Sequence, residues 1–212
     1  AFGGVLVANR PINVATAREI DKLFLEVLIA PDFEAEALTI LEGKKNRILL
    51  RQKEAIDARW SYRSMLGGVL AQETDRAVET TAEMKPVTKV APTAEELTDL
   101  VFATKLVKHS KSNAIVLSKG GQLIASGVGQ TSRVDALKQA IEKARHFGFD
   151  LKGAVLASDA FFPFDDCVTL AAEAGITAIA QPGGSVRDAD SIAAADRLGI
   201  AMVMTGVRHF KH

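Results

Sequence analysis

The chain has 212 residues, of which 48% are hydrophobic and 25% charged, as expected for a globular protein with a substantial core. Lysine plus arginine equals aspartate plus glutamate at 26 each, so no overall charge favours nucleic acid or a membrane surface. A single cysteine, Cys167, excludes an internal disulfide, and no cysteine and histidine cluster offers a zinc site. These features favour a reducing, cytoplasmic setting, and the length allows one large domain or two small ones.

The first quarter of the chain alternates apolar strands with amphipathic helices. Residues 2–8 predict a buried strand, and Asn13 is expected to cap a helix that runs to Leu23 or Phe24. Further strands are expected at 27–30 and 47–50, with a helix at 33–42 between them. The apolar start is too short to span a bilayer and lacks the basic residues of a signal peptide. Because domains rarely open on a buried strand, we expect an earlier part of the protein to be missing.

The pattern weakens between residues 51 and 92, where one strand is expected at 65–72. This segment holds the only Trp and Tyr, Trp60 and Tyr62. Two interpretations compete for it, a connector between subdomains and an arm that packs on another subunit. The arm is favoured because these two residue types are common at interfaces, although a small local core is an equal alternative for the aromatic pair.

Regular patterning returns at Thr93, where Thr93 and Glu96 form a capping box that begins a helix to Val107. Apolar runs at 113–117 and 123–126 flank Lys-Gly-Gly and predict a hairpin. The remaining elements alternate between helix and strand. Helices are expected at 134–147, 168–174 and 188–198, and strands at 153–157, 177–180 and 200–204. This alternation predicts an α/β fold with helices on both faces of a sheet.

The loop from Ser158 to Asp166 combines three phenylalanines with three aspartates and follows a predicted strand. Ligands of α/β proteins collect at the carboxyl ends of strands, and this composition suits a flat ring with polar edges. In the alternative interpretation, the phenylalanines only close the end of the sheet. Asp165 or Asp166 then caps the next helix.

Two further segments are candidates for binding an anion. The glycine-rich turn 127–132 precedes Arg133 and a helix, a pattern that can bind an anion but more often serves backbone geometry. The loops after the strands ending at 157, 180 and 204 are expected at one edge of the sheet. They would bring Arg208 and the tail 208–212 to the phenylalanine loop, as suits a phosphate attached to a ring. The alternative is a solvated basic tail.

Five motifs in this order resemble the C-terminal part of bacterial bifunctional purine biosynthesis proteins. They are Lys-Ser-Asn-Ala at 111–114, the turn 127–133, the loop 158–164, Gln-Pro-Gly-Gly-Ser at 181–185 and the ending 208–212. Members of this family carry aminoimidazole carboxamide ribonucleotide (AICAR) transformylase and IMP cyclohydrolase activities. The resemblance implies a three-layer α/β/α fold with cytidine deaminase-like subdomains that lack zinc. It divides the chain into 1–92, part of a first transformylase subdomain plus a connector, and 93–212, the second subdomain.

The resemblance also implies roles for individual residues. The expected AICAR contacts are Gly3, Glu26, Asn113, Arg133 and Arg208, with Arg208 near the phosphate. The expected contacts to the co-substrate 10-formyltetrahydrofolate are Arg133, Val134, Phe161, Asp166, Ser185 and Val186. A potassium ion (K+) is expected near Val107, Ser110, Ser112, Asp159 and His209.

The implied reaction is transfer of a formyl group from the folate to the 5-amino group of AICAR. That amine is a poor nucleophile, so a base must take its proton while donors stabilise the tetrahedral oxyanion. The family's catalytic Lys-His pair lies earlier than this chain begins, and Lys108-His109 imitates it in a segment where the family's chemistry is not located. No catalytic residue is therefore expected here. The alternative function is a nucleotide-binding and dimerisation module without catalysis. In either case a homodimer and the missing N-terminal part are the expected partners.

Overall fold

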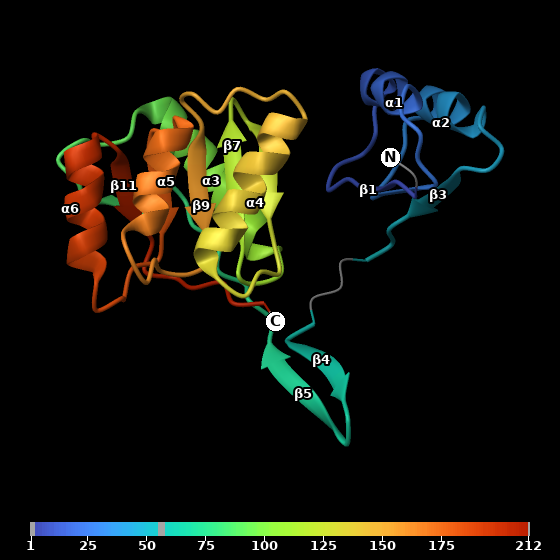
Figure 1. The fold of residues 1–212 in the computed structure, drawn as a ribbon. Helices are drawn as coiled ribbons and strands as arrows, with labels where there is room; N and C mark the ends of the chain where they lie inside the picture. The colour runs from blue at the N-terminus through green and yellow to red at the C-terminus, as the bar shows by residue number, and fades with distance from the viewer. Residues whose placement is uncertain (1–2, 55–57, 212) are drawn as a thin grey trace. The chain divides into compact units, whose positions relative to one another are not determined.

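The computed structural model describes residues 3–54 and 58–211, which form two compact units, Ala1–Thr74 and Asp75–His212. Figure 1 shows the helices and strands of both units. Within the described part of the chain, no helix is long and apolar enough to cross a membrane.

The first unit is built on three parallel strands whose order in the sheet follows the chain. They are β1 (Val5–Val7), β2 (Val27–Ala30) and β3 (Ile48–Arg51). Helices α1 (Val14–Asp21) and α2 (Ala35–Glu42) connect them, and the Asn13 side chain caps α1 by accepting from the Thr16 amide at 2.9 Å. Five elements are present here as expected from the sequence, with end shifts of a few residues, although residue 2 of the expected first strand lies outside the described residues. The expected burial of that strand is wrong, because Val5 is 58% and Val7 68% exposed.

A two-stranded hairpin occupies the segment that the sequence described least well. Strands β4 (Trp60–Met65) and β5 (Gly68–Glu73) pair with each other, so the single strand expected at 65–72 is wrong. The turn falls inside that range, at Leu66 and Gly67, because Met65 already pairs with Gly68. Trp60 is 40% exposed and Tyr62 65% exposed. Among the described residues they therefore form no local core, and the arm that packs on another subunit stays a prediction.

The segment after the hairpin packs with the second unit. Met84 belongs to a core cluster of that unit, and β6 (Lys85–Pro86), which the sequence did not predict, pairs antiparallel with β11 (Ala201–Met204). The boundary between the two compact units therefore falls between residues 74 and 75 of the chain. The subdomain boundary proposed from the family resemblance falls at residue 92.

The second unit contains a six-stranded sheet in the order β6-β11-β10-β9-β7-β8. Strands β9 (Val155–Ser158), β10 (Ala178–Gln181) and β11 run parallel. Strand β7 (Ile115–Lys119) is antiparallel to both of its neighbours, β9 and β8 (Gln122–Gly127). The start of β7 therefore lies beside the ends of β8 and β9, which places three segments far apart in sequence at one edge.

Helices cover both faces of this sheet. Helix α3 (Ala94–Lys108), which begins with the predicted capping box, packs on one face through a cluster that includes Leu100 and Val116. Helices α4 (Arg133–His146), α5 (Asp166–Ala174) and α6 (Asp188–Leu198) pack on the other. Figure 1 shows the sheet between these two helix layers. The predicted three-layer α/β/α class is confirmed for this unit.

Candidate functional site

The candidate site lies at the edge of the second unit where β7 begins and β8 and β9 end. Ile115 pairs with Ser158 and with Gly127, so the residues just outside these pairs are neighbours. Ser132 caps helix α4 by accepting from the Asp135 amide at 3.2 Å, which fixes the first turn of the helix and the residue that opens it, Arg133.

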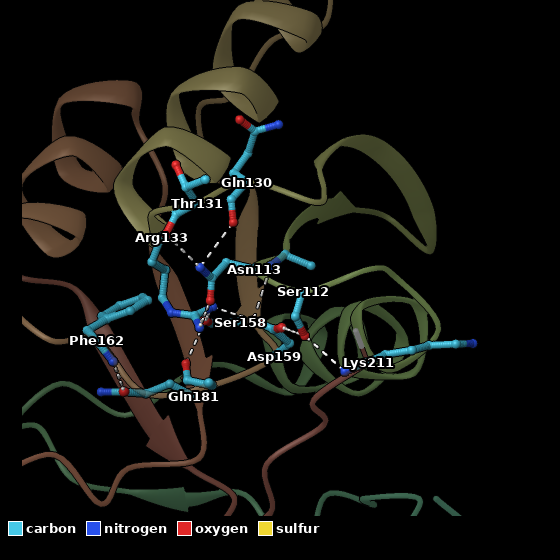
Figure 2. A network of polar contacts seen from close by, with 12 residues as sticks. Ser112, Asn113, Gln130, Thr131, Arg133, Ser158, Asp159, Phe162, Gln181 and Lys211 are labelled. Carbon is cyan, nitrogen blue, oxygen red and sulfur yellow. Dashed lines mark hydrogen bonds and ion pairs between the residues drawn. The ribbon is translucent and has the colours of Figure 1, made fainter. Parts of the chain in front are cut away.

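Arg133 is the centre of a polar network at this edge (Figure 2). Its Nη1 donates to Ser158 Oγ at 3.0 Å and to the Asp159 carboxylate, and its Nη2 donates to Asn113 Oδ1 at 2.9 Å. The side-chain nitrogen of Asn113, Nδ2, in turn donates to the carbonyl oxygens of Gln130 and Thr131 at 3.1 and 3.2 Å. The guanidinium thus joins α4, the residues before β7 and the end of β9.

Asp159 is fully buried, and each of its carboxylate oxygens accepts hydrogen bonds. Oδ2 accepts from Ser112 Oγ at 2.6 Å, and Oδ1 accepts from the Ala114 amide at 3.2 Å as well as from Arg133. A buried carboxylate without such partners would be strongly destabilising. The Lys211 amide donates to Ser112 Oγ at 3.0 Å, which ties the C-terminal tail to the same network.

A pocket of about 320 Å³ opens beside this network. Three predicted site residues line it, Asn113, Arg133 and Phe161. The other lining residues are Thr131, Ser132, Ala160, Pro163 and Phe210. A fixed guanidinium, an amide and two aromatic rings that line one pocket suit a flat ring with polar edges.

Arg208 lies on the exposed side of the C-terminal tail. Its guanidinium stacks on Phe210, with 4.2 Å between Cζ and the ring centroid, and Phe210 lines the pocket. The tail is therefore not a purely solvated basic segment, and Arg208 is held near the pocket through its neighbour.

The phenylalanine loop combines both interpretations offered by the sequence. Phe162 is fully buried and its amide donates to Gln181 Oε1 at 3.0 Å, so this ring closes the end of the sheet. Phe161 faces the pocket instead, and Phe164 is 50% exposed. Asp165 occupies the N-cap position of α5 without a side-chain hydrogen bond to the helix.

The other residues expected to contact folate are not among those lining the pocket. Val134 is half-buried at the start of α4, and Asp166 is exposed, with its Oδ1 accepting from the Cys167 amide at 2.7 Å. Ser185 is half-buried and Val186 fully exposed in the loop before α6. Their folate contacts stay predictions.

Gly3 and Glu26 belong to the first unit and lie close together. Gly3 has a φ of +72°, a conformation that favours glycine, and a Cβ placed on it would lie 3.4 Å from Glu26 Oε2. Glu26 is exposed just before β2. A side chain at position 3 would therefore compete for space with the Glu26 carboxylate.

The residues expected to hold potassium lie near the end of α3 and the network. The His209 amide donates to the Asp159 carbonyl at 2.9 Å, and the Ser110 amide donates to the Val107 carbonyl at 3.0 Å. Their hydroxyl, carbonyl and carboxylate oxygens are the ligand types that a hard cation prefers. Ser112 and Asp159 bond each other, however, and Arg133 already neutralises the carboxylate. The site stays a prediction.

Lys108 and His109 do not line the pocket. Lys108 is buried, and its Nζ donates to the Ala77 carbonyl at 2.5 Å and lies 3.7 Å from Asp75 Oδ1. Partial burial and the nearby charges of Lys211 and Lys108 lower the pKa of His109. The absence of a catalytic role for the dipeptide stays a prediction.

Sequence reasoning missed an acidic cluster around the buried His209 side chain. Its ring nitrogens lie 2.6 Å from Asp75 Oδ2 and 2.9 Å from Glu79 Oε1. Asp75 and Glu79 fall in the poorly patterned segment 51–92, so no periodic signal marked them. The uncommon sequence Arg-His-Phe-Lys-His was the only local sign that the tail has specific partners.

Comparison with known proteins places this chain in a family. A sequence model described as the AICARFT/IMPCHase bienzyme matches residues 1–143. The chain belongs to the AICARFT/IMPCHase bienzyme family. Curated relatives of the family named bifunctional purine biosynthesis protein PurH match over the whole chain. Those of Bacteroides thetaiotaomicron, Thermoanaerobacter sp. and Aquifex aeolicus are 62%, 53% and 51% identical to it. The chain covers 42%, 41% and 41% of these relatives, so it spans about two fifths of their length.

Solved structures give a weaker likeness. A dCMP deaminase from the cyanophage S-TIM5 matches 47% of this chain and 88% of its own, with 18% identity and a TM-score of 0.36. A Thermotoga maritima diaminohydroxyphosphoribosylaminopyrimidine deaminase/reductase matches 51% of this chain and 34% of its own, with 27% identity and a TM-score of 0.35. Scores this low do not define the fold, and the three-layer α/β class rests on the strand order and the two helix layers.

Proposed function

We propose that this chain is the C-terminal portion of an AICAR transformylase, which transfers a formyl group from 10-formyltetrahydrofolate to AICAR during purine biosynthesis. The observation that most directly supports this proposal is the pocket beside Arg133. The buried Arg133 guanidinium, the Asn113 side-chain amide and the rings of Phe161 and Phe210 all line it. Family membership supports the same proposal, because the relatives are named as bifunctional purine biosynthesis proteins.

The pocket has chemistry suited to an imidazole carboxamide nucleotide. The Phe161 and Phe210 rings offer flat apolar walls, and Arg208, stacked on the Phe210 ring, offers a positive charge for a phosphate. Arg133 is held in one orientation by Ser158, Asp159 and Asn113, so it needs little reordering when a ligand binds. Gly3 and Glu26 of the first unit remain further proposed contacts to AICAR.

In the proposed reaction the amine nitrogen of AICAR attacks the formyl carbon of the folate. The bond between that carbon and folate N10 then breaks, the amine loses a proton and N10 gains one. No catalytic residue is assigned to this chain, which supplies binding and orientation, and the base belongs to the missing part of the longer protein. A homodimer, a cytoplasmic setting and the potassium ion are further parts of this proposal.

Calorimetric titration of the chain with AICAR tests the proposal. Wild type should bind, and Arg208→Ala should weaken binding by about 1.5–3 kcal/mol because one charge-assisted phosphate contact is lost. Arg145→Ala is the matched control, since Arg145 is an exposed arginine in the last turn of α4, away from the pocket-lining residues. A folded wild-type chain that binds no AICAR would contradict a preformed nucleotide site. Equal losses for the two variants would show that Arg208 makes no specific contact.

A further inference from the structure

The C-terminal tail is held by a buried histidine that lies between two acidic side chains. His209 Nδ1 lies 2.6 Å from Asp75 Oδ2, and Nε2 lies 2.9 Å from Glu79 Oε1. Ionised carboxylates only accept hydrogen bonds, so both ring nitrogens are placed to donate. His209 and Glu79 are almost fully buried, which makes these hydrogen bonds costly to lose. The three residues are called here the His209 cluster.

A buried lysine joins the cluster to helix α3. Lys108, the last residue of α3, donates from Nζ to the Ala77 carbonyl at 2.5 Å and lies 3.7 Å from Asp75 Oδ1. The cluster therefore connects the segment 75–79, the end of α3 and the tail. Because buried charges are stable only with partners, these contacts favour one arrangement of the three segments.

The backbone of the same tail contacts the polar network of the candidate site. The His209 amide donates to the Asp159 carbonyl at 2.9 Å, and the Ser112 amide donates to the Lys211 carbonyl at 2.8 Å. The Lys211 amide donates to Ser112 Oγ at 3.0 Å (Figure 2). The tail is thus held both by its backbone, at the network, and by the His209 ring, at the cluster.

The two residues that flank His209 in sequence both belong to the candidate site. Phe210 lines the pocket, and the Arg208 guanidinium stacks on its ring. Stacking on a ring face leaves the N–H donors in the plane of the guanidinium, where they suit a phosphate. Because residues 208–210 are consecutive, a fixed ring at position 209 limits the directions that both neighbours can take.

The charged partners of His209 are informative because an apolar side chain could also attach the tail. Replacing a buried charged group and its partners by apolar residues is often neutral or stabilising. Hydrogen bonds differ from apolar contacts in that they require a narrow range of distance and angle. The His209 cluster therefore suits a role in which the direction of the tail matters as well as its attachment.

We propose that the His209 cluster positions Arg208 for the phosphate of the bound nucleotide. This inference rests on the proposed function and deepens it, because it makes phosphate recognition depend on carboxylates 130 and 134 positions before His209. The cluster is a positioning element that acts through Arg208. Without it, the tail would have to be ordered when the nucleotide binds, and that ordering costs affinity.

Calorimetric titration of the 212-residue chain with two ligands tests the proposal. The ligands are AICAR and the corresponding riboside, which lacks the phosphate. The test variant is Asp75→Ala, because the Asp75 side chain is 37% exposed and its loss leaves no buried void. The control is Glu83→Ala in the same exposed segment. Each variant removes an acceptor for a backbone amide, that of Ala77 for Asp75 and that of Thr80 for Glu83, but Glu83→Ala leaves the His209 cluster in place.

Asp75→Ala should bind AICAR about fivefold more weakly than wild type, because Arg208 must then be ordered on binding. The affinity for the riboside should be unchanged, and Glu83→Ala should bind both ligands as wild type does. Asp75→Asn should recover most of the lost affinity, since an amide oxygen can still accept from His209 Nδ1. In an Arg208→Ala background, Asp75→Ala should cause no further loss.

Three results would overturn the proposal. They are normal AICAR binding by Asp75→Ala, equal weakening for AICAR and the riboside, and a loss that persists in the Arg208→Ala background. Amide hydrogen exchange gives a readout without ligand, and circular dichroism checks that each variant is folded. Exchange at the His209 and Lys211 amides should be faster in Asp75→Ala and unchanged in Glu83→Ala. Unchanged exchange in Asp75→Ala would also overturn the proposal.

The same measurements separate this inference from the proposed function. A wild-type chain that binds AICAR, with Asp75→Ala binding it equally well, overturns the positioning role and leaves the proposed function standing. A folded wild-type chain that binds no AICAR overturns the proposed function and the phosphate role of the cluster with it. Exchange at the two tail amides then still decides whether the cluster anchors the tail.

Discussion

His209 Nδ1 lies 2.6 Å from Oδ2 of Asp75, a residue 134 positions earlier in the chain. The other ring nitrogen lies 2.9 Å from Glu79 Oε1, and both His209 and Glu79 are almost fully buried. This contact fixes the C-terminal tail to the first residues of the second unit. The tail also carries Arg208 and Phe210, so the cluster positions the outer wall of the pocket.

Asp75 should stabilise the fold at neutral pH and lose this effect in acid. Desolvation alone would raise its pKa, but the hydrogen bond and charge of His209, with the Ala77 amide and Lys108, hold the pKa below the ordinary 3.8. A lowered pKa means that the stabilisation is present above 3.8 and is lost as pH falls through the folded-state pKa. Asp75 is partly exposed, so we expect Asp75→Asn to lower the free energy of unfolding by only about 1 kcal/mol at pH 7.

Urea unfolding at pH 7 and at several values below pH 4 checks this expectation. The difference between wild type and Asp75→Asn should shrink as the pH falls. A difference that stays constant between pH 7 and pH 3 would contradict the assigned pKa direction.

Asp159→Asn should be strongly destabilising because it leaves the Arg133 guanidinium buried without its counterion. Breaking a buried pair from one side typically costs about 3–5 kcal/mol. Asp190→Asn is the control, since it removes the partner of Arg187 from a pair in which both side chains are 50% exposed. That change should cost less than about 1 kcal/mol. Urea unfolding followed by circular dichroism measures both, and similar values for the two variants would argue against the central role of the buried pair.

Gly127→Ala should displace helix α4, which carries Arg133. A Cβ at position 127 would lie 1.8 Å from the Ala136 carbonyl oxygen, and this backbone atom cannot move without the helix. We expect a loss of about 3 kcal/mol in unfolding free energy. Gly67→Ala is the control because a Cβ there meets nothing within 4 Å. Thermal unfolding that leaves the two variants alike would show that β8 and α4 separate easily.

Cys167 should be unreactive in the folded protein. Burial, together with the nearby Asp166 carboxylate, raises the pKa of the thiol to about 12, so very little thiolate exists at pH 8. Dithionitrobenzoate should therefore react with native chain far more slowly than with chain unfolded in urea. Rapid reaction of native protein would mean that α5 opens readily and exposes the thiol.

Local sequence signals predicted most helices and strands because these depend on near neighbours. Asn13, the Thr93 and Glu96 capping box and the alternating apolar runs fix element ends through contacts within a few residues. The hairpin β4–β5 was misplaced because both of its strands are exposed along their whole length, so no buried apolar face marks their ends in the sequence. The short strand β6 was missed because it exists only through its pairing with β11.

The α/β class of the chain, its family and the segments that surround the candidate site could all be predicted from the sequence. Those properties follow from local patterning and from ordered motifs. Three contacts could not be predicted in this way and are known from the three-dimensional structure. Arg133 pairs with Asp159, Phe161 faces the pocket while Phe162 is buried, and His209 contacts Asp75 and Glu79. The physical reason is the antiparallel insertion of β7 between β8 and β9, which brings segments tens of residues apart to one edge, where side-chain direction depends on register.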